Sequence, residues 1–323
     1  MIAPTEITYF SKLDASMQPA LMWAAKDDEP RPLVVCLHTW SARIDRPRYY
    51  AQYLPRCIER NWHFIFPLFR GPNYTPEACG SDLVVSDLEC AVTYMKENYK
   101  VDESKIFLLG GSGGGHASLL MAGRRPELFT AVSSWCPISD IAAWFKEVNT
   151  KKQPSTKRDY DDHIFEACGG NPLTDEKAAA EAKHRSPLTW LPNATDNVIL
   201  DIGTGIHDGH TGSVPISHAI RAFNTVAREE DRISEEDIAY MVENEKVPEH
   251  LRFEGEDIAY GPYTVYLRRT SGKVRLTLFE GGHAMVAGAA FGFFDRQVRG
   301  AEPVWNSGDV YDEELNEETE LTK

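Results

Sequence analysis

The sequence predicts an α/β fold in which helices flank a mostly parallel, twisted sheet. Short apolar runs alternate along the chain with segments whose apolar residues recur at helical spacing. The composition is that of a globular protein, because 42% of the 323 residues are hydrophobic and 26% are charged. No apolar stretch is long enough to span a bilayer, and a net charge of −15 argues against nucleic-acid or membrane partners.

The predicted elements begin with an antiparallel pair and continue as alternating strands and helices. Residues 7–10 and 20–24 are apolar runs joined by a polar turn at 12–16, and 32–37 is a buried strand. The later elements are a helix at 49–60, a strand at 63–67, a helix at 82–99, a strand at 106–109, a helix at 116–122, strands at 131–135, 197–202 and 274–279, and a final helix at 287–297.

No repeat or low-complexity linker divides the chain, so we expect one domain over residues 1–305. Two segments, about 140–192 and 228–272, are too long for simple connections and are expected near a ligand cleft. The first is expected to form helices over one end of the sheet. The second is acidic, and Ser234 resembles the start of a capped helix. Residues 306–323 form an acidic tail, which we expect to be solvated.

A glycine-rich run, GGSGGG at 110–115, directly follows the strand predicted at 106–109 and opens a helix. A phosphate-binding loop would need lysine and serine or threonine where His116 and Ala117 stand. A dinucleotide fingerprint starting at Gly111 would need glycine at position 116. The pattern G-x-S-x-G fits, and its place between a strand and a helix is typical of a sharp turn that carries a nucleophile, here Ser112.

A serine nucleophile needs a base, and a base of this kind is oriented by an acid. His283 follows the last predicted strand after two glycines, so it is the expected base. Asp208 lies in the loop after strand 197–202 and is the expected acid, with Asp201 inside that strand as the alternative. The order Ser112, Asp208, His283 is the one found when this turn carries a triad.

Two backbone donors are expected to stabilise the oxyanion. One is the N–H of Gly113, and the other comes from the loop after strand 32–37, with Trp40 preferred over Thr39. The segment His207-Asp208-x-His210 is too closely spaced for a relaxed metal site, so neither a metal nor another cofactor is expected. Candidate pocket residues, some of which could instead be core or brace positions, are His38, His207, His210, Trp40, Trp135, Trp144 and Trp190.

These motifs resemble the catalytic domain of prolyl oligopeptidase-like serine hydrolases, within the α/β-hydrolase superfamily. The resemblance covers about residues 32–297. It departs from the family in the longer intervals after Asp208, and residues 1–31 leave no room for the propeller that the family's peptidases carry before this domain. The family resemblance rests on four motifs: 101–106 leading into 110–114, Ser186-Pro187-Leu188, Gly205-x-x-Asp208 before Val214-Pro215, and Gly281-Gly282-His283. Together with the short segment before the first core strand, this resemblance implies a stand-alone esterase.

Three functions follow from these residues. The first is a serine esterase acting on a small-molecule or glycan ester, such as an acetyl or aryl ester of a carbohydrate. The second is a peptidase that uses the same triad on an amide, with carboxylates of the acidic segment gripping the peptide amino terminus. The third is a non-catalytic binding module on a hydrolase scaffold.

The six cysteines are scattered and contain no C-x-x-C pair. Cys36 and Cys136 lie in apolar runs and are expected to be buried thiols, whereas Cys79 and Cys90 could bridge. The first residues lack a signal peptide, which favours a cytoplasmic location, or a periplasmic or secreted one if the sequence is a mature form. The sequence leaves the oligomeric state open.

Overall fold

The computed structural model describes residues 3–41, 50–150 and 159–305, and within them nine strands form one sheet. The strand order is β1-β2-β4-β3-β5-β6-β7-β9-β8, with parallel pairing from β4 to β9 and antiparallel pairing towards both edges. This confirms the predicted fold class. The strands are β1 Thr5–Ser11, β2 Ser16–Trp23, β3 Arg31–Leu37, β4 His63–Pro67, β5 Val101–Gly111, β6 Ala131–Trp135, β7 Ile199–Gly205, β8 Val265–Ser271 and β9 Val274–Phe279.

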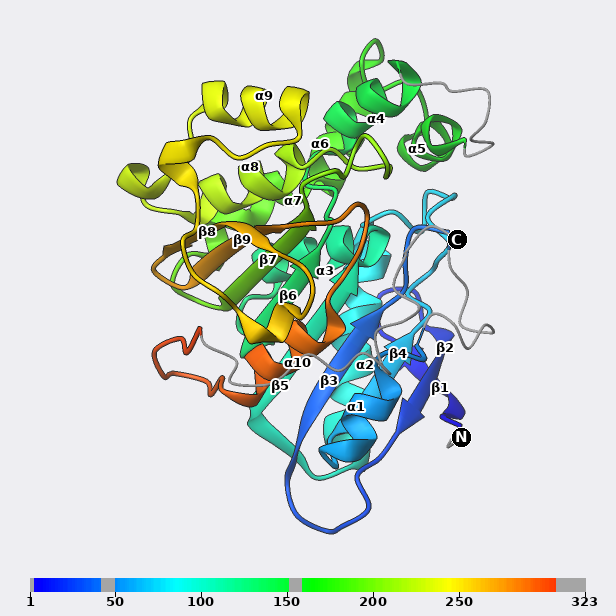
Figure 1. The fold of residues 1–323 in the computed structure, drawn as a ribbon. Coiled ribbons are helices and arrows are strands. Elements are labelled where there is room, and N and C mark those ends of the chain that lie inside the picture. Colours follow the sequence, from blue (N-terminus) through cyan, green and yellow to red (C-terminus); the bar gives the residue numbers. More distant parts are fainter. Residues whose placement is uncertain (1–2, 42–49, 151–158, 306–323) are drawn as a thin grey trace.

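Helices cover both faces of this sheet and gather beyond one of its ends (Figure 1). The α-helices are α1 Leu54–Glu59, α2 Asp82–Asn98, α3 Gly113–Arg124, α4 Ile141–Thr150, α5 Tyr160–Cys168, α6 Glu176–Arg185, α7 Pro187–Trp190, α8 Ser217–Val226, α9 Glu235–Asn244 and α10 Ala287–Asp295. Short 3₁₀ turns are η2 Leu191–Ala194, η3 Glu229–Asp231, η4 Glu249–Leu251 and η5 Ile258–Tyr260.

Side chains of β3 point alternately to the two faces of the sheet, so this strand contributes to the apolar core on each face. Leu33 and Val35 point to the face covered by α2, α3 and α8. Val34 and Cys36 point to the opposite face, which α1, α10 and η5 cover. Because successive strand side chains point to opposite faces, an uninterrupted apolar run is required when both faces are buried.

A third apolar cluster lies outside the two faces of the sheet and is built by α4, α5 and α6. These helices come from the long segment after β6, and Figure 1 shows them beyond one end of the sheet. The cluster also contains Trp40, from the loop after β3. The prediction that the 140–192 segment forms helices over one end of the sheet is confirmed for its described residues.

The elements differ from the prediction at a few places. The helix predicted at 49–60 is shorter, because α1 begins at Leu54 with a proline in its first turn. The acidic segment contains an unpredicted strand, β8, which pairs antiparallel with β9. Ser234 caps α9 as expected, since its hydroxyl accepts a hydrogen bond from the Asp237 amide at 3.1 Å. The predicted acidic tail, 306–323, lies outside the described residues.

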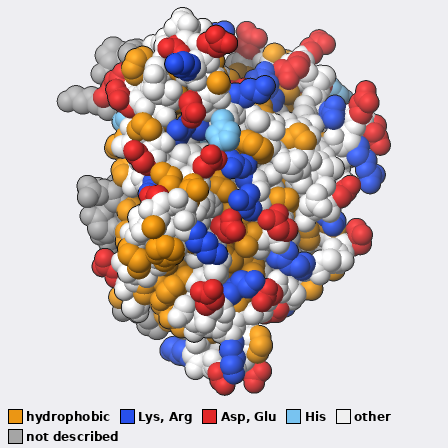
Figure 2. Space-filling model, turned by 180° about the vertical axis from the view of Figure 1, so that it is seen from behind, with side chains coloured by type: hydrophobic (Ala, Val, Ile, Leu, Met, Phe, Trp, Pro, Cys, Tyr) orange, Lys and Arg blue, Asp and Glu red, His pale blue; other side chains and the backbone are white. Residues whose placement is uncertain are grey.

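The surface shown in Figure 2 mixes acidic, basic and apolar side chains, so this face presents no field of a single sign. In the described ranges, no helix has the length and apolar character needed to cross a membrane. All six cysteines are free and buried, so the conceivable bridge between Cys79 and Cys90 is absent.

Candidate active site

Ser112 occupies the sharp turn between β5 and α3. Its backbone has φ 58° and ψ −120°, a strained conformation for a residue with a side chain. The flanking glycines are needed for packing, because a Cβ on Gly110 would lie 2.2 Å from the carbonyl oxygen of Gly114. The Ser112 amide donates to the Trp135 carbonyl at 2.8 Å, which ties the turn to the end of β6. The predicted turn for a nucleophile is therefore present.

His283 and Asp208 form a buried hydrogen-bonded pair in the loops after β9 and β7. The imidazole Nδ1 lies 2.7 Å from Oδ2 of Asp208. The other carboxylate oxygen, Oδ1, accepts from the amides of Gly209 at 2.9 Å and Val214 at 3.2 Å. The loop that carries the carboxylate thus fixes its orientation, which suits it to orient the imidazole.

The charge of Asp208 controls the protonation of His283. Burial of the imidazole by itself would lower the pKa of His283, but the neighbouring Asp208 and Cys136 outweigh burial and raise that pKa well above 6.5. A histidine of raised pKa is a strong base, which favours removal of a proton from a hydroxyl.

The alternative acid, Asp201, serves another purpose. It lies within β7 and forms a buried ion pair with Arg275 of β9, at 2.7 Å between Oδ1 and Nε. The contact links two neighbouring strands inside the sheet. The structure therefore brings Asp208 to His283 and leaves Asp201 in the core.

Hydrogen bonds connect the Ser112 turn, through the end of β6, to the loop that carries His283. Trp135 accepts the Ser112 amide, and the next residue, Cys136, has its Sγ 3.1 Å from the carbonyl oxygen of Ala284. His283 Nε2 is buried and has no hydrogen-bond partner among the described residues. The hydrogen bond between Ser112 and this nitrogen is thus absent here, and catalytic hydrogen bonds of this kind often form only when substrate binds.

The loop after β3 brings Trp40 against Gly113. A Cβ on Gly113 would lie 2.4 Å from the Trp40 backbone nitrogen, so these two backbones are in close contact. The backbones of both predicted oxyanion donors therefore lie side by side. His38 braces the loop as its ring nitrogens lie 2.8 Å from the Thr39 carbonyl and 2.7 Å from the Leu68 carbonyl. His38 is therefore a brace and is not available as a pocket residue.

Two members of the predicted aromatic pocket are packed in apolar clusters. Trp135 is fully buried beside Tyr260 and Phe279 on the face of the sheet covered by α10. Trp144 is buried against Trp40, and its indole N–H donates to the Ser213 carbonyl at 2.8 Å. Both indoles are covered by neighbouring apolar side chains, so neither presents an open face on which a sugar ring could stack.

His207 and His210 join the acidic segment to the site. His207 lies between two carboxylates, with Nδ1 2.7 Å from Glu245 and Nε2 3.0 Å from Glu280. His210 has its Nε2 2.6 Å from the Val242 carbonyl of α9. Both histidines thus fasten α9 beside the Asp208 loop, a role that the sequence did not reveal because Glu245 is 38 residues distant.

Cys136 was missed as a site residue. Its thiol lies beside the Asp208 and His283 pair, and one ligand atom from each of the three residues falls within 4.8 Å of the others. The available signal was its position directly after a parallel strand, at the same edge of the sheet as Ser112.

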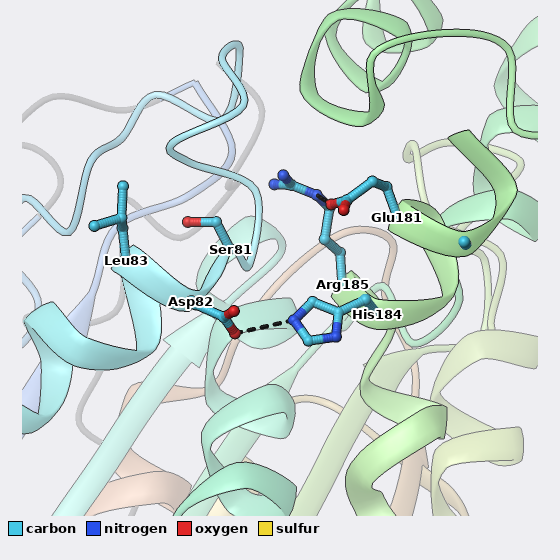
Figure 3. A pocket seen from close by; sticks show the side chains of 7 residues that line it. Ser81, Asp82, Leu83, Glu181, His184 and Arg185 are labelled. Atoms are coloured by element: carbon cyan, nitrogen blue, oxygen red, sulfur yellow. Dashed lines mark hydrogen bonds and ion pairs between the residues drawn. The ribbon is translucent and has the colours of Figure 1, made fainter. Parts of the chain in front are cut away.

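A pocket elsewhere on the surface differs from this site in its chemistry (Figure 3). It has a volume of about 470 Å³ and lies between the start of α2 and the end of α6. Its charged groups are already paired: Asp82 lies 2.9 Å from His184, and Arg185 lies 3.1 Å from Glu181. No residue of the Ser112 site lines it. Its lining residues are Ser81, Asp82, Leu83, Ala180, Glu181, His184 and Arg185.

The comparisons with known proteins show which family and which folds this chain resembles. The profile of the prolyl oligopeptidase family matches residues 81–235. The structure of an acylaminoacyl peptidase from Pyrococcus horikoshii is similar, with a TM-score of 0.62 and 14% identity over 94% of this chain and 43% of that one. A puromycin-hydrolyzing peptidase from Mycobacterium tuberculosis gives a TM-score of 0.57 and 17% identity over 94% of this chain and 42% of that one.

A structure of puromycin hydrolase is also similar, with a TM-score of 0.58 and 15% identity over 95% of this chain and 41% of that one. This chain therefore spans less than half the length of each of these proteins. No curated protein matches the sequence. At these identities the likeness shows the fold.

Proposed function

We propose that this chain, whose residues 81–235 match the prolyl oligopeptidase family, is a serine hydrolase that cleaves the amide bonds of short peptides or aminoacyl amides with Ser112, His283 and Asp208. The observation that carries this function is the buried pair of Asp208 and His283, which leaves Nε2 of the base without another partner near the strained Ser112 turn. That arrangement suits a base waiting for a hydroxyl proton.

The proposed reaction has two halves. Ser112 Oγ attacks the carbonyl carbon as His283 Nε2 takes its proton, and Asp208 stabilises the imidazolium. The N–H groups of Gly113 and Trp40 donate to the oxyanion, and such a donor contributes about 3–4 kcal/mol to lowering the barrier. His283 then gives the proton to the leaving amine, and a water molecule, activated by the same base, releases the acyl group from Ser112.

The choice of an amide follows from two lines of support. The similar solved structures are of an acylaminoacyl peptidase and of puromycin-hydrolysing enzymes. In addition, the feature that favoured a sugar ester is missing, since Trp135 and Trp144 are buried. Glu245 and Glu280 are engaged by His207, so we assign neither carboxylate to a peptide amino terminus.

A substrate panel tests the proposal. The purified chain is assayed with aminoacyl and N-acetyl-aminoacyl nitroanilides, puromycin, p-nitrophenyl acetate and acetylated xylose, beside Ser112→Ala. We expect amide turnover that Ser112→Ala abolishes, together with fluorophosphonate labelling of the unaltered protein alone. Labelling without turnover of any amide, and with faster turnover of the acetylated sugar, contradicts the peptidase assignment. Absence of labelling contradicts the serine mechanism itself.

A further inference from the structure

The two edges of the sheet, β8 and β1, are built differently (Figure 1). At the β8 edge, the register with β9 shifts between Val265 and Leu267, and the Phe253 amide donates to the Tyr266 carbonyl at 2.9 Å. Bulges and covering segments are devices that keep an edge strand from pairing with another chain. Among the residues that the structure describes, the β1 edge has neither, because its register with β2 is unbroken and no other segment bonds to its backbone.

The backbone of β1 points hydrogen-bonding groups away from the sheet. Thr8 lies opposite Pro19 of β2, and the Pro19 carbonyl accepts from the Leu68 amide at 3.0 Å, on the β4 side of β2. Both backbone polar groups of a residue in an antiparallel strand point to the same side, so Thr8 and Pro19 are not hydrogen-bonded to each other. The N–H and C=O groups of Thr8 therefore face the free edge, as do those of Glu6 and Phe10 at two-residue spacing.

Large apolar side chains lie exposed along this edge. Phe10 of β1 is 54% exposed, and its cross-strand partner on β2, Met17, is 56% exposed. Leu13, in the turn between the two strands, is 57% exposed. The side chain of Tyr9 points to the other face and is buried in the core against α2. A regular edge strand with exposed apolar side chains is a template on which another strand can pair.

The order of residues along β1 makes this edge complementary to itself. When two copies of β1 pair antiparallel about a two-fold axis at Tyr9, Glu6 of each copy lies opposite Lys12 of the other. Thr8 of each copy then lies opposite Phe10 of the other, so outward-facing backbone groups meet outward-facing backbone groups. A two-fold axis makes each of these contacts twice. Opposite charges that face each other across a pair of strands are stabilising, and like charges are destabilising.

We propose that β1 is the surface through which two copies of this chain associate, so that the sheet of one copy continues into the sheet of the other. The occupant is a second copy because the exposed charges at the two ends of the strand, on Glu6 and Lys12, match only when the strand meets itself in the opposite direction. Association satisfies the outward N–H and C=O groups and covers the Phe10 side chain. The proposal does not depend on the proposed function.

A charge exchange tests the second copy and the register together. Sedimentation velocity of the full chain at increasing concentration should show a monomer–dimer equilibrium. Glu6→Lys and Lys12→Glu should each raise the dissociation constant roughly tenfold or more, because two pairs of like charges then face each other. An equimolar mixture of these two variants should dimerise as the unaltered chain does, because opposite charges meet again at both ends of the strand.

A backbone variant tests the strand pairing. Thr8→Pro removes an N–H that faces away from β2, so the monomer should stay folded by circular dichroism while the dimer is lost. Leu173→Lys is the control, because it alters a side chain that is 48% exposed in a segment distant from β1 in the sequence, and the dimer should persist.

Hydrogen exchange of the unaltered chain reports on the occupant. The Glu6, Thr8 and Phe10 amides should gain protection as the concentration rises through the dissociation constant. A chain that stays monomeric at all concentrations, or a dimer that survives Thr8→Pro, would overturn the proposal. Protection of these amides in a monomer would show that a segment of the same chain covers the edge, and would also overturn it.

Discussion

Gly212 lies so close to Asp208 that a Cβ at this glycine would be 2.2 Å from the Oδ1 atom. The same Cβ would lie 2.4 Å from the Cβ of His283. The loop of 208–214 therefore packs against the side chains of both Asp208 and His283, and the missing side chain at Gly212 leaves space for them. The pair is positioned by backbone packing as well as by its hydrogen bond.

The first prediction concerns this packing. Gly212→Ala should displace Asp208 or His283 and lower kcat by about 10²-fold, the cost of a misplacement of about 1 Å at a reacting group. Gly300→Ala is the control, because a Cβ there meets nothing within 4 Å, so the strain from its positive φ of 80° should lower stability but leave kcat unchanged. Steady-state kinetics and circular dichroism of both variants check the result. Unchanged kcat in a folded Gly212→Ala protein would contradict it.

The second prediction separates the two candidate acids. Asp208→Asn should lower kcat by about 10⁴-fold, because the amide favours the wrong tautomer of His283. Asp201→Asn should instead lower the free energy of unfolding by about 3–5 kcal/mol, since the buried Arg275 guanidinium would lose the negative charge that faces it. Kinetics and urea denaturation of the two variants distinguish these losses. A catalytic defect larger for Asp201→Asn than for Asp208→Asn would reverse the assignment.

The third prediction is a pH dependence. The pKa of His283 is raised well above 6.5 by Asp208 and Cys136, against the effect of burial, and only the unprotonated ring accepts a proton. The rate should therefore rise with pH through a pKa on the alkaline side of 6.5. The imidazolium stabilises the folded state below the unfolded pKa of about 6.5, and this contribution is lost as the pH rises through the folded pKa.

Asp208→Asn provides the comparison for that profile. Removal of the carboxylate charge should move the kinetic pKa to lower pH, because burial of His283 then acts with less opposition. The measurement is kcat/KM against pH with an activated ester, for both proteins. A profile with the same pKa in both proteins would show that Asp208 does not control the base.

The fourth prediction concerns the attachment of α9. Both nitrogens of His207 face carboxylates, so both bonds form with the imidazolium, and the pKa of His207 is raised by Glu245 and Glu280 against the effect of burial. His207→Gln should speed hydrogen exchange in 235–244. In the unaltered protein the same protection should be full below about pH 6.5 and fall as the pH rises through the raised pKa.

The control is His250→Gln, because His250 lies in η4 and makes an exposed contact to Asp237, which is a residue of α9. Exposed ion pairs contribute little, so exchange in α9 should hardly change. Exchange is measured by mass spectrometry and corrected for the intrinsic effect of pH. Equal protection of α9 in His207→Gln and in the unaltered protein would contradict the assigned attachment.

Much of this architecture was predictable because the parallel strands are buried on both faces. Strands predicted at 63–67, 131–135 and 274–279 match β4, β6 and β9 residue for residue. The edge strand β8 was missed, since its pattern of buried and exposed residues is weak and it lies in an acidic segment. An edge strand forms because it pairs with its neighbour, here β9, and the sequence of the edge strand alone does not reveal that pairing.

The candidate site divides in the same way. Ser112, Asp208 and His283 could be predicted as one candidate set because each follows a strand in the motif order, and the structure places the last two in contact. Tertiary partners were not visible in the sequence. Trp135 and Trp144 were expected at the substrate but close apolar cores, because burial of a large ring outweighs any preference for the cleft.

Because β8 pairs with β9, the position of His283 does not depend on the length of the acidic segment before β8. Seven residues, Val265–Ser271, return the chain to the sheet before β9 starts. An insertion or deletion between Arg228 and Thr264 can therefore be absorbed upstream of this hairpin, which leaves the register that delivers His283 unchanged. The length of this segment, and with it the surroundings of the Asp208 loop, can thus change without moving the base.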